Sequence, residues 1–190
     1  MPEIPLPDPP LDDGTVALRP WDPSDLFPLV EAAQDPEIPR WTAVPAPYSE
    51  HDAREYLARV EIDRRSGREL GLAVVDSGDG ALLGSCGLAR FDWQDRKVEV
   101  GYWVAGSARR RSVGSRATAL LSRWALVGLG MERVELLANP ANEASQRLAE
   151  RAGFTREGLL RAYRRRKGER EDLIMFSLLA GDLGSSAHGR

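Results

Sequence analysis

Few folds accommodate a chain that runs from an alternating apolar strand through a basic loop into an amphipathic helix and back to a short apolar strand. Residues 97–104 read Lys-Val-Glu-Val-Gly-Tyr-Trp-Val and predict a strand. A basic loop follows over 107–112, and a helix is predicted over 113–127, where glycine ends it. Residues 133–137 predict a second, buried strand. This order of elements favours a mixed α/β fold.

The loop that enters the predicted helix is suited to bind a phosphate. A helix N-terminus presents unpaired backbone N–H groups and the positive end of the helix dipole. Arg109, Arg110 and Arg111 add positive charge at the same place. Taken alone, these residues are equally compatible with a solvated, charged helix start.

The rest of the chain supplies further strands and helices. Residues 69–75, 81–91 and 97–104 predict an antiparallel meander with a tight turn at Ser77–Gly80. The other predicted elements are a strand over 16–19, helices over 26–33 and about 50–65, a proline-rich loop over 35–47, a helix from the Asn142 cap to Arg151, and strands over 154–163 and 172–179 joined by a loop over 164–170.

Length and composition bound the class of protein. The 190 residues suit one domain over 15–180, with an extended N-terminal arm over 1–14 and a disordered tail over 181–190. A net charge of −3 argues against broad nucleic-acid binding. We find no signal peptide and no membrane-spanning stretch, so we expect no membrane partner and a cytoplasmic protein.

The counts of cysteine and histidine exclude several chemistries. Cys86 is the only cysteine, so neither an intramolecular disulfide nor a cysteine-based zinc site can form, and we expect no metal. Of the two histidines, His188 lies in the tail, which leaves His51 alone to support a Ser-His-Asp mechanism. Cys86 is expected to be a buried strand residue and not a nucleophile.

A set of motifs in fixed order resembles the GNAT superfamily of N-acetyltransferases, and in particular the Rim-type branch that acetylates ribosomal-protein N-termini. Arg109-Arg-Arg-Ser-Val-Gly114 is similar to the family's Arg/Gln-x-x-Gly-x-Gly/Ala loop, and Glu99-Val-Gly-Tyr-Trp-Val104 to the branch's Glu-Ile-Gly-Tyr-Trp strand. Asn142-Glu-Ala-Ser145, the Gly-Phe of 153–154 and the Glu-Gly of 157–158 resemble its downstream signature. The resemblance covers about residues 15–180.

The resemblance implies a GNAT-like fold: a central mixed sheet, mostly antiparallel, with helices on both faces. The strands on either side of the 113–127 helix should be parallel and splay apart to admit the pantetheine arm of acetyl-CoA. It also implies direct attack by an amine on the thioester, without an acyl-enzyme. The implied cofactor-binding residues are Trp103, Val104, Arg109, Arg110, Arg111, Ser112, Val113, Gly114, Ser115 and Asn142.

Two residues of the loop depart from the family pattern. Ser112 stands where the family has its second glycine, and members of the branch often have glycine at the position of Arg110. Glycine lets the backbone approach a phosphate closely and adopt unusual dihedral angles. Ser112 either crowds the pyrophosphate or adds a hydrogen bond to it.

Two residues are candidates for catalysis. Ser145 matches the serine thought to hydrogen-bond the CoA sulfur, and its alternative role is to satisfy backbone N–H groups of the first helical turn. Glu99 shares a strand face with Gly101 and could take a proton from the amine, directly or through water; alternatively it pairs with a neighbour such as Arg90. Asn142 is expected to cap its helix.

The sequence offers fewer candidates for the residues that bind the amine acceptor. Trp41, Trp93 and Tyr163 are candidates for the walls of the substrate site, although single aromatic residues are usually packing residues. The basic run from Arg164 to Lys167 either grips an acidic acceptor or nucleic acid, or forms a solvated hairpin tip, which charge runs usually do.

We therefore expect an enzyme that moves an acetyl group from acetyl-CoA to a primary amine, such as a protein N-terminus. A small-molecule amine acetyltransferase and a catalytically silent acyl-CoA-binding module are the alternatives. The sequence fixes neither the acceptor nor the oligomeric state, and it leaves a homodimer open.

Overall fold

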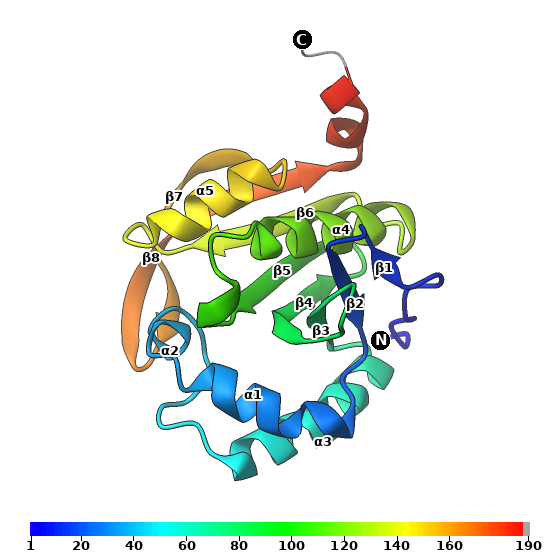
Figure 1. Cartoon of the computed structure of the whole chain (residues 1–190). Helices are drawn as coiled ribbons and strands as arrows, with labels where there is room; N and C mark the ends of the chain where they lie inside the picture. Colours follow the sequence, from blue (N-terminus) through cyan, green and yellow to red (C-terminus); the bar gives the residue numbers. More distant parts are fainter. Residues whose placement is uncertain (188–190) are drawn as a thin grey trace.

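The computed structural model describes residues 1–187, and His188, Gly189 and Arg190 lie outside the described part. Eight strands form one sheet in the order β1-β2-β3-β4-β5-β6-β8-β7 (Figure 1). Neighbouring strands are antiparallel except β5 and β6, which are parallel. The strands are β1 Leu11–Asp12, β2 Val16–Arg19, β3 Glu69–Asp76, β4 Leu82–Asp92, β5 Lys97–Val104, β6 Arg133–Ala138, β7 Thr155–Arg166 and β8 Glu169–Leu179.

Helices cover both faces of this sheet, which confirms the predicted mixed fold. Helices α1–α3 lie at the bottom of the view in Figure 1, and α4 and α5 lie in its upper half, next to β5–β8. The helices are α1 Leu26–Ala33, α2 Glu37–Trp41, α3 Glu50–Arg65, α4 Val113–Val127 and α5 Glu143–Arg151; short 3-10 segments are η1 Pro23–Asp25, η2 Gly106–Ala108 and η3 Ala180–Ala187. Among the described residues, no helix is long and apolar enough to cross a membrane.

Alternation along the central strands assigns each side chain to a face. On β5, Val98 and Val100 are buried in the core that α4 covers. The residues between them, Glu99 and Gly101, therefore face α1–α3. Helix α4 buries Val113, Ala117, Leu121 and Ala125, at a spacing of four residues, against this core. The residue parity of β5 thus decides which groups lie on which side of the sheet.

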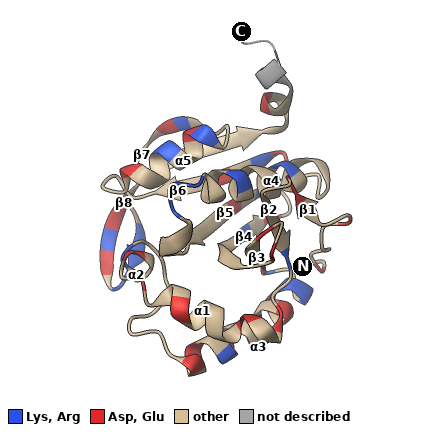
Figure 2. Ribbon diagram, viewed as in Figure 1, with Lys and Arg blue, Asp and Glu red and all other residues tan. Residues whose placement is uncertain are grey.

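The β7–β8 hairpin corrects the sequence prediction of a loop over 164–170. Both strands continue to a two-residue turn at Lys167 and Gly168, which have φ of 50° and 87°. Two consecutive positive φ angles are typical of a tight hairpin turn. The run of charged residues favours a loop in the sequence, because such runs are usually solvated. Here opposite charges support the strand, and Figure 2 shows Lys/Arg and Asp/Glu interspersed along the hairpin.

The proline-rich segment 35–47 also differs from its prediction as a loop, because residues 37–41 form helix α2. Pro36 occupies the N-cap position, and Asp35 Oδ1 accepts a hydrogen bond from the backbone N–H of Glu37. Pro39 lies in the first turn, where backbone N–H groups have no intrahelical partner, so it does not break the helix.

The N-terminal arm and the residues that follow β8 contact the domain within the described part of the chain. In the N-terminal arm, Ile4 is fully buried and its backbone N–H donates to the carbonyl of Arg64, while β1 pairs with β2. In the segment 181–190, for which the sequence predicts disorder, residues 181–187 belong to η3, and 188–190 lie outside the described residues. Asp182 there accepts a hydrogen bond from the backbone N–H of Leu179.

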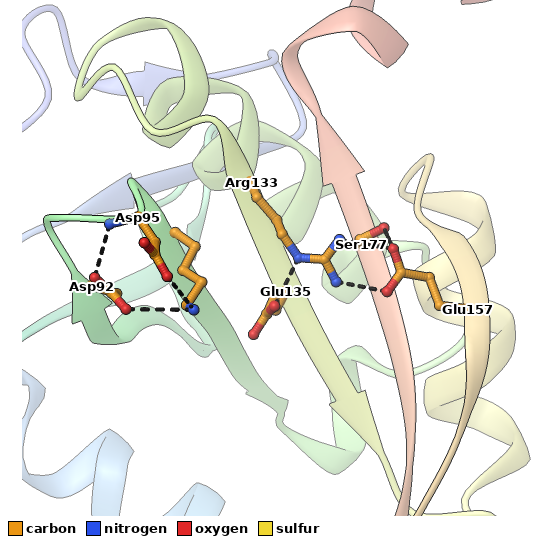
Figure 3. Close-up of polar contacts among 7 residues, drawn as sticks. Asp92, Asp95, Arg133, Glu135, Glu157 and Ser177 are labelled. Carbon is orange, nitrogen blue, oxygen red and sulfur yellow. Dashed lines mark hydrogen bonds and ion pairs between the residues drawn. The ribbon is translucent and has the colours of Figure 1, made fainter.

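An ion-pair network joins β6, β8 and β7, the last three strands in the order of the sheet (Figure 3). Arg133 of β6 donates to both carboxylate oxygens of Glu157 of β7 at 2.8 and 2.7 Å, and to Glu135 at 2.7 Å. Ser177 of β8 donates to Glu157 at 2.6 Å. These donors lower the pKa of Glu157 to about 2, chiefly through Arg133.

This network predicts a pH-dependent contribution to stability. An unfolded glutamate has a pKa near 4.3, so the stabilisation by Glu157 is present above that pH and is lost as the pH falls towards 2. Because the Glu157 side chain is 42% exposed, we expect Glu157→Gln to lower the free energy of unfolding by only about 1 kcal/mol at pH 7. Urea titrations at several pH values measure the difference. Exposed Glu150 is the control, and an equal effect of Glu150→Gln would contradict the assignment.

Candidate active site

The candidate site lies where β5 and β6 part. The parallel pairing joins only Lys97 to Arg133, Val98 to Val134 and Glu99 to Glu135. Beyond that point β5 continues to pair with β4 as far as Val104, and β6 pairs with β8 along its whole length. The predicted parallel, splayed strands are therefore present, and the β5 backbone from Gly101 to Val104 has no strand partner on its β6 side.

The loop that enters α4 exposes a row of backbone donors. Arg110 and Ser112 both adopt left-handed backbone conformations, with φ of 60° and 59°, and Ser112 is the N-cap of α4 without a side-chain capping bond. No backbone N–H from residue 110 to 115 donates to an acceptor in the part of the chain that the structure describes. Left-handed residues alternating with others turn successive N–H groups to one side, which creates an anion-binding concavity.

The arginines of this loop are exposed and only loosely held. Arg109 pairs with Asp35 at 2.9 Å, and Arg111 with Asp76 at 3.3 Å. Arg110 forms no ion pair with any described residue. Exposed pairs of this kind contribute little free energy, about 0–1 kcal/mol each, so the guanidinium groups are free to turn to an anionic ligand.

Gly114 lets α4 approach its neighbours closely. A Cβ atom added there would lie 2.5 Å from Leu148 of α5 and 3.1 Å from Val104 of β5. The glycine that the sequence assigned to the phosphate loop is therefore required by packing as well. It sets the distance between α4 and α5, and hence where the first turn of α5 stands.

The first turn of α5 holds Ser145 beside β5. The side chain of Asn142 accepts a hydrogen bond from the Ser145 backbone N–H at 3.1 Å, so Asn142 is the helix cap, as predicted. The Ser145 hydroxyl does not cap the helix; it accepts a hydrogen bond from the hydroxyl of Tyr102 at 2.9 Å. Burial raises the pKa of Tyr102 to about 12, so its hydroxyl stays protonated near neutral pH.

Tyr102 is the site residue that the sequence reasoning missed. It stands within the Gly-Tyr-Trp motif, but no role was assigned to it. The signal was available, because Tyr102 has the same strand parity as Val98 and Val100 and therefore points to the helix that carries Ser145.

Glu99 lies on the opposite face of β5. Its two carboxylate oxygens accept hydrogen bonds from Arg164 at 3.0 and 2.5 Å, and Arg90 lies 3.4 Å away. The Glu99 side chain is only 16% exposed. The sequence anticipated pairing with Arg90, whereas the shorter contacts come from Arg164, which the hairpin brings across from β7.

A β-bulge explains how β7 reaches this face. Its register with β8 shifts between Leu160 and Arg164, and Ala162 adopts φ of 48° while its N–H donates to Asp172. A bulge bends its strand and re-aims the side chains beside it. The side chains of Tyr163 and Arg164 are thereby directed towards the face of Glu99.

Glu99, Trp93 and Tyr163 line one open hollow of about 660 Å³, together with Lys97 and Glu135. Trp93 stacks on Phe91 with ring centroids 4.9 Å apart. Two of the three predicted wall residues therefore meet at Glu99. The third does not line this hollow: Trp41 lies on α2, where its ring nitrogen donates to Glu37.

Space next to the gap is also open on this face. A Cβ atom added at Gly101 would meet no atom within 4 Å. Trp103, two residues further, packs its side chain towards the α1–α3 cluster, and Val104 packs against Gly114. Trp103 and Val104 therefore turn their side chains to the two faces of the sheet and leave their backbone at the edge of the gap.

Comparison with known proteins identifies the class. The family model described as acetyltransferase (GNAT) domain matches residues 15–155, which is most of the chain. The chain therefore belongs to the GNAT acetyltransferase family and is an acyl-CoA-dependent N-acyltransferase.

Individual relatives are also named N-acetyltransferases, and one is named for the ribosomal branch that the motifs resemble. The uncharacterized N-acetyltransferase p20 of Bacillus licheniformis is 26% identical over 165 residues, covering 86% of this chain and 92% of that protein. The putative ribosomal N-acetyltransferase YdaF of Bacillus subtilis is 36% identical over 101 residues, or 53% of this chain and 55% of that one. Mycobacterium smegmatis RimJ in complex with CoA-disulfide has the same fold, with a TM-score of 0.80, 22% identity and coverage of 90% and 85%.

The left-handed residues of the α4 entry give a stability prediction. A left-handed backbone conformation costs any residue with a Cβ atom about 1–2 kcal/mol, and a change to glycine removes this cost. Glycine also has more conformational freedom in the unfolded state, which takes back roughly 0.5–1 kcal/mol of that gain. We expect Ser112→Gly and Arg110→Gly each to raise the free energy of unfolding by about 0.5 kcal/mol in urea titrations.

Ser107 is the matched control, because it lies in η2 and has no positive φ. Ser107→Gly should lower the free energy of unfolding. A loss of the same size for Ser112→Gly would contradict the strain assigned to the loop.

Proposed function

We propose that this enzyme transfers an acetyl group from acetyl-CoA to the α-amine of a polypeptide, with Ser145 serving the sulfur and Glu99 the amine. The observation that carries the proposal is the placement of these two residues on opposite faces of β5, at the point where β6 leaves it. A thioester lying in the gap is then reached from both faces of the sheet.

The residues present suit CoA. The pyrophosphate has a candidate cradle in the free N–H groups of residues 110–115 and the exposed guanidinium groups beside them. The unpaired backbone of β5 from Gly101 to Val104 offers an amide chain such as pantetheine the ladder positions that β6 vacates. The pyrophosphate cradle and this strand edge adjoin each other at the N-terminus of α4.

On the α4–α5 face, Ser145 has a hydroxyl that does not cap its helix. Once Glu99 has taken a proton from the ammonium group, the amine nitrogen bonds to the thioester carbonyl carbon, the C–S bond breaks, and sulfur leaves with the electron pair as a thiolate. The nitrogen releases its second proton to solvent, and the thiolate takes one up from solvent. A hydroxyl hydrogen bond to sulfur strengthens as this charge develops, and so it stabilises the transition state more than the bound donor.

On the α1–α3 face, the hollow offers carboxylates to an amine. Glu99, Glu135 and Asp92 line it beside the cations Arg90 and Lys97, so carboxylates outnumber cationic side chains in its lining, while Trp93 and Tyr163 supply aromatic walls. Arg164 takes one lone pair on each Glu99 oxygen, and Arg90 lies 3.4 Å from Oε2, so the second lone pair of Oε1 stays free. Glu99 can therefore still accept a proton from the ammonium group, directly or through water.

The case for a polypeptide acceptor rests on the breadth of this hollow and on the relatives. The hollow is open, and Tyr163 at its edge is 47% exposed, which leaves room for a chain that extends into solvent. One relative is named a putative ribosomal N-acetyltransferase, and a structural neighbour is RimJ.

The test is a screen of acetyl-CoA consumption over N-terminal peptides and free amines, combined with calorimetric titration of CoA. Turnover with peptides but not with free amines is the expected result. Turnover with free amines alone would make the acceptor a small molecule. Absence of CoA binding at millimolar concentration would overturn the assignment of the cradle. Ser112→Gly should change the affinity for CoA by less than about tenfold, or 1.4 kcal/mol.

Loss of the Ser145 hydroxyl should affect turnover more than binding. We expect Ser145→Ala to lower kcat at least tenfold, by roughly the free energy of one hydrogen bond to a developing charge, while the Kd for CoA changes about twofold or less. Steady-state kinetics and calorimetry give the two quantities. Equal kcat in the variant and the parent enzyme would remove Ser145 from the reaction.

The role of Glu99 predicts a dependence on pH. An α-amine has a pKa near 8, so near neutral pH most acceptor molecules are protonated and need a base. We expect the kcat/KM of Glu99→Gln to be depressed most at about pH 7 and to recover partly at about pH 9. A uniform loss across the profile, reproduced by Arg164→Gln, would show that Glu99 serves only as the partner of Arg164.

A further inference from the structure

We infer that Tyr102 is a positioning residue for Ser145: the phenol donates its proton to Ser145 Oγ, and the serine proton is thereby turned towards the thioester sulfur. The inference rests on the proposed function, because Ser145 has a sulfur to serve only when an acyl-CoA thioester lies between β5 and β6.

Tyr102 is built into the sheet and α4 and is not carried by a loop. It pairs with Cys86 across the β4–β5 ladder, and both residues belong to or pack against the core that α4 covers. Its ring edge would lie 3.6 Å from a Cβ atom at Gly114. The hydroxyl therefore has little freedom to move, and Ser145 lies at the end of a rigid side chain.

Counting protons and lone pairs fixes the direction of the serine proton. A hydroxyl has one proton to donate and two lone pairs that accept. Tyr102 gives its proton to Ser145 Oγ, which occupies one lone pair of the serine. The Ser145 proton must then point away from Tyr102.

Among the described residues, the Ser145 hydroxyl forms no hydrogen bond with the backbone of its own helical turn. Serine in a first helical turn often bonds to backbone groups nearby. Here Asn142 accepts the backbone N–H of Ser145, and no hydrogen bond from the Ser145 hydroxyl to backbone is formed within the described chain. The serine proton remains available for a group in the gap.

Tyr102 keeps the proton that it donates to Ser145 Oγ. Burial raises the pKa of Tyr102 to about 12, so the phenol is not ionised near neutral pH and remains able to donate. During transfer the C–S electron pair moves to sulfur and the Ser145 hydrogen bond to it strengthens. No proton leaves Tyr102, whose hydrogen bond polarises the serine hydroxyl.

The experiment is a double-mutant cycle with the acceptor that supports turnover. We expect Tyr102→Phe, which removes only the hydroxyl oxygen, to lower kcat about tenfold with KM for acetyl-CoA nearly unchanged, roughly the effect of one hydrogen bond. Added to Ser145→Ala, it should lower kcat less than about twofold further, because a residue that acts through Ser145 has no effect without it.

The roles of Tyr102 and Ser145 can also be tested by binding affinities, without turnover. CoA and desulfo-CoA, which lacks the sulfur, are titrated into the parent, Tyr102→Phe and Ser145→Ala. The parent should prefer CoA, and both variants should show a smaller ratio of the two affinities. If no acceptor supports turnover, the proposed function fails, while the ratio still decides the role of Tyr102.

Tyr48→Phe is the control, since Tyr48 is another buried tyrosine, lies in the separate α1–α3 cluster and has a pKa that burial raises to about 12. It should leave kcat and the affinity ratio unchanged. An undiminished effect of Tyr102→Phe in the Ser145→Ala background, or parent-like kcat and affinity ratio in Tyr102→Phe, would overturn the inference.

Discussion

The structure depends on an interruption of its own sheet. A parallel ladder satisfies backbone groups only while the strands stay together, and buried groups left without partners cost free energy. Here the β5–β6 ladder ends after three residue pairs. Each strand is nevertheless held firmly, because β4 pairs with β5 to its end and β8 pairs with every residue of β6. Each strand is thus fixed by a neighbour on its other side, while the backbone of β5 from Gly101 to Val104 has no partner among the described strands on its β6 side.

The parity of one strand organises the chemistry around this gap. Tyr102 meets Ser145 on the side of α4 and α5, while Glu99 meets Arg164 on the side of α1–α3. The first turn of α5 and the bulged β7–β8 hairpin thus contact side chains on opposite faces of β5. Gly114 contributes by bringing α4 and α5 close together, which places the first turn of α5 over Tyr102.

Much of this architecture was readable from the sequence, and the exceptions have a common cause. Periodicity and caps gave α1, α3, α4 and α5, because apolar spacing, Ser49, Asn142 and terminal glycines act locally. Helix α2 and the extended β7–β8 hairpin were missed because charges and prolines argued against them. Their support comes from distant groups: Arg166 and Lys167 donate to the carbonyls of Arg40 and Pro39 at 2.7 and 2.6 Å. The contacts of Glu99 with Arg164 and of Tyr102 with Ser145 depend likewise on tertiary structure.

The conformation of the loop that enters α4 also depends on the surrounding structure. Glycine at positions 110 and 112 would adopt positive φ without strain, and Arg110 and Ser112 adopt it nonetheless. Their conformation shows that the loop geometry is imposed by the elements that flank it, since the residues themselves disfavour it by about 1–2 kcal/mol each. Both side chains are exposed, and neither forms a hydrogen bond or ion pair with a described residue. The backbone donors therefore keep the arrangement that glycine would give, and Arg110 adds a charge that glycine could not supply.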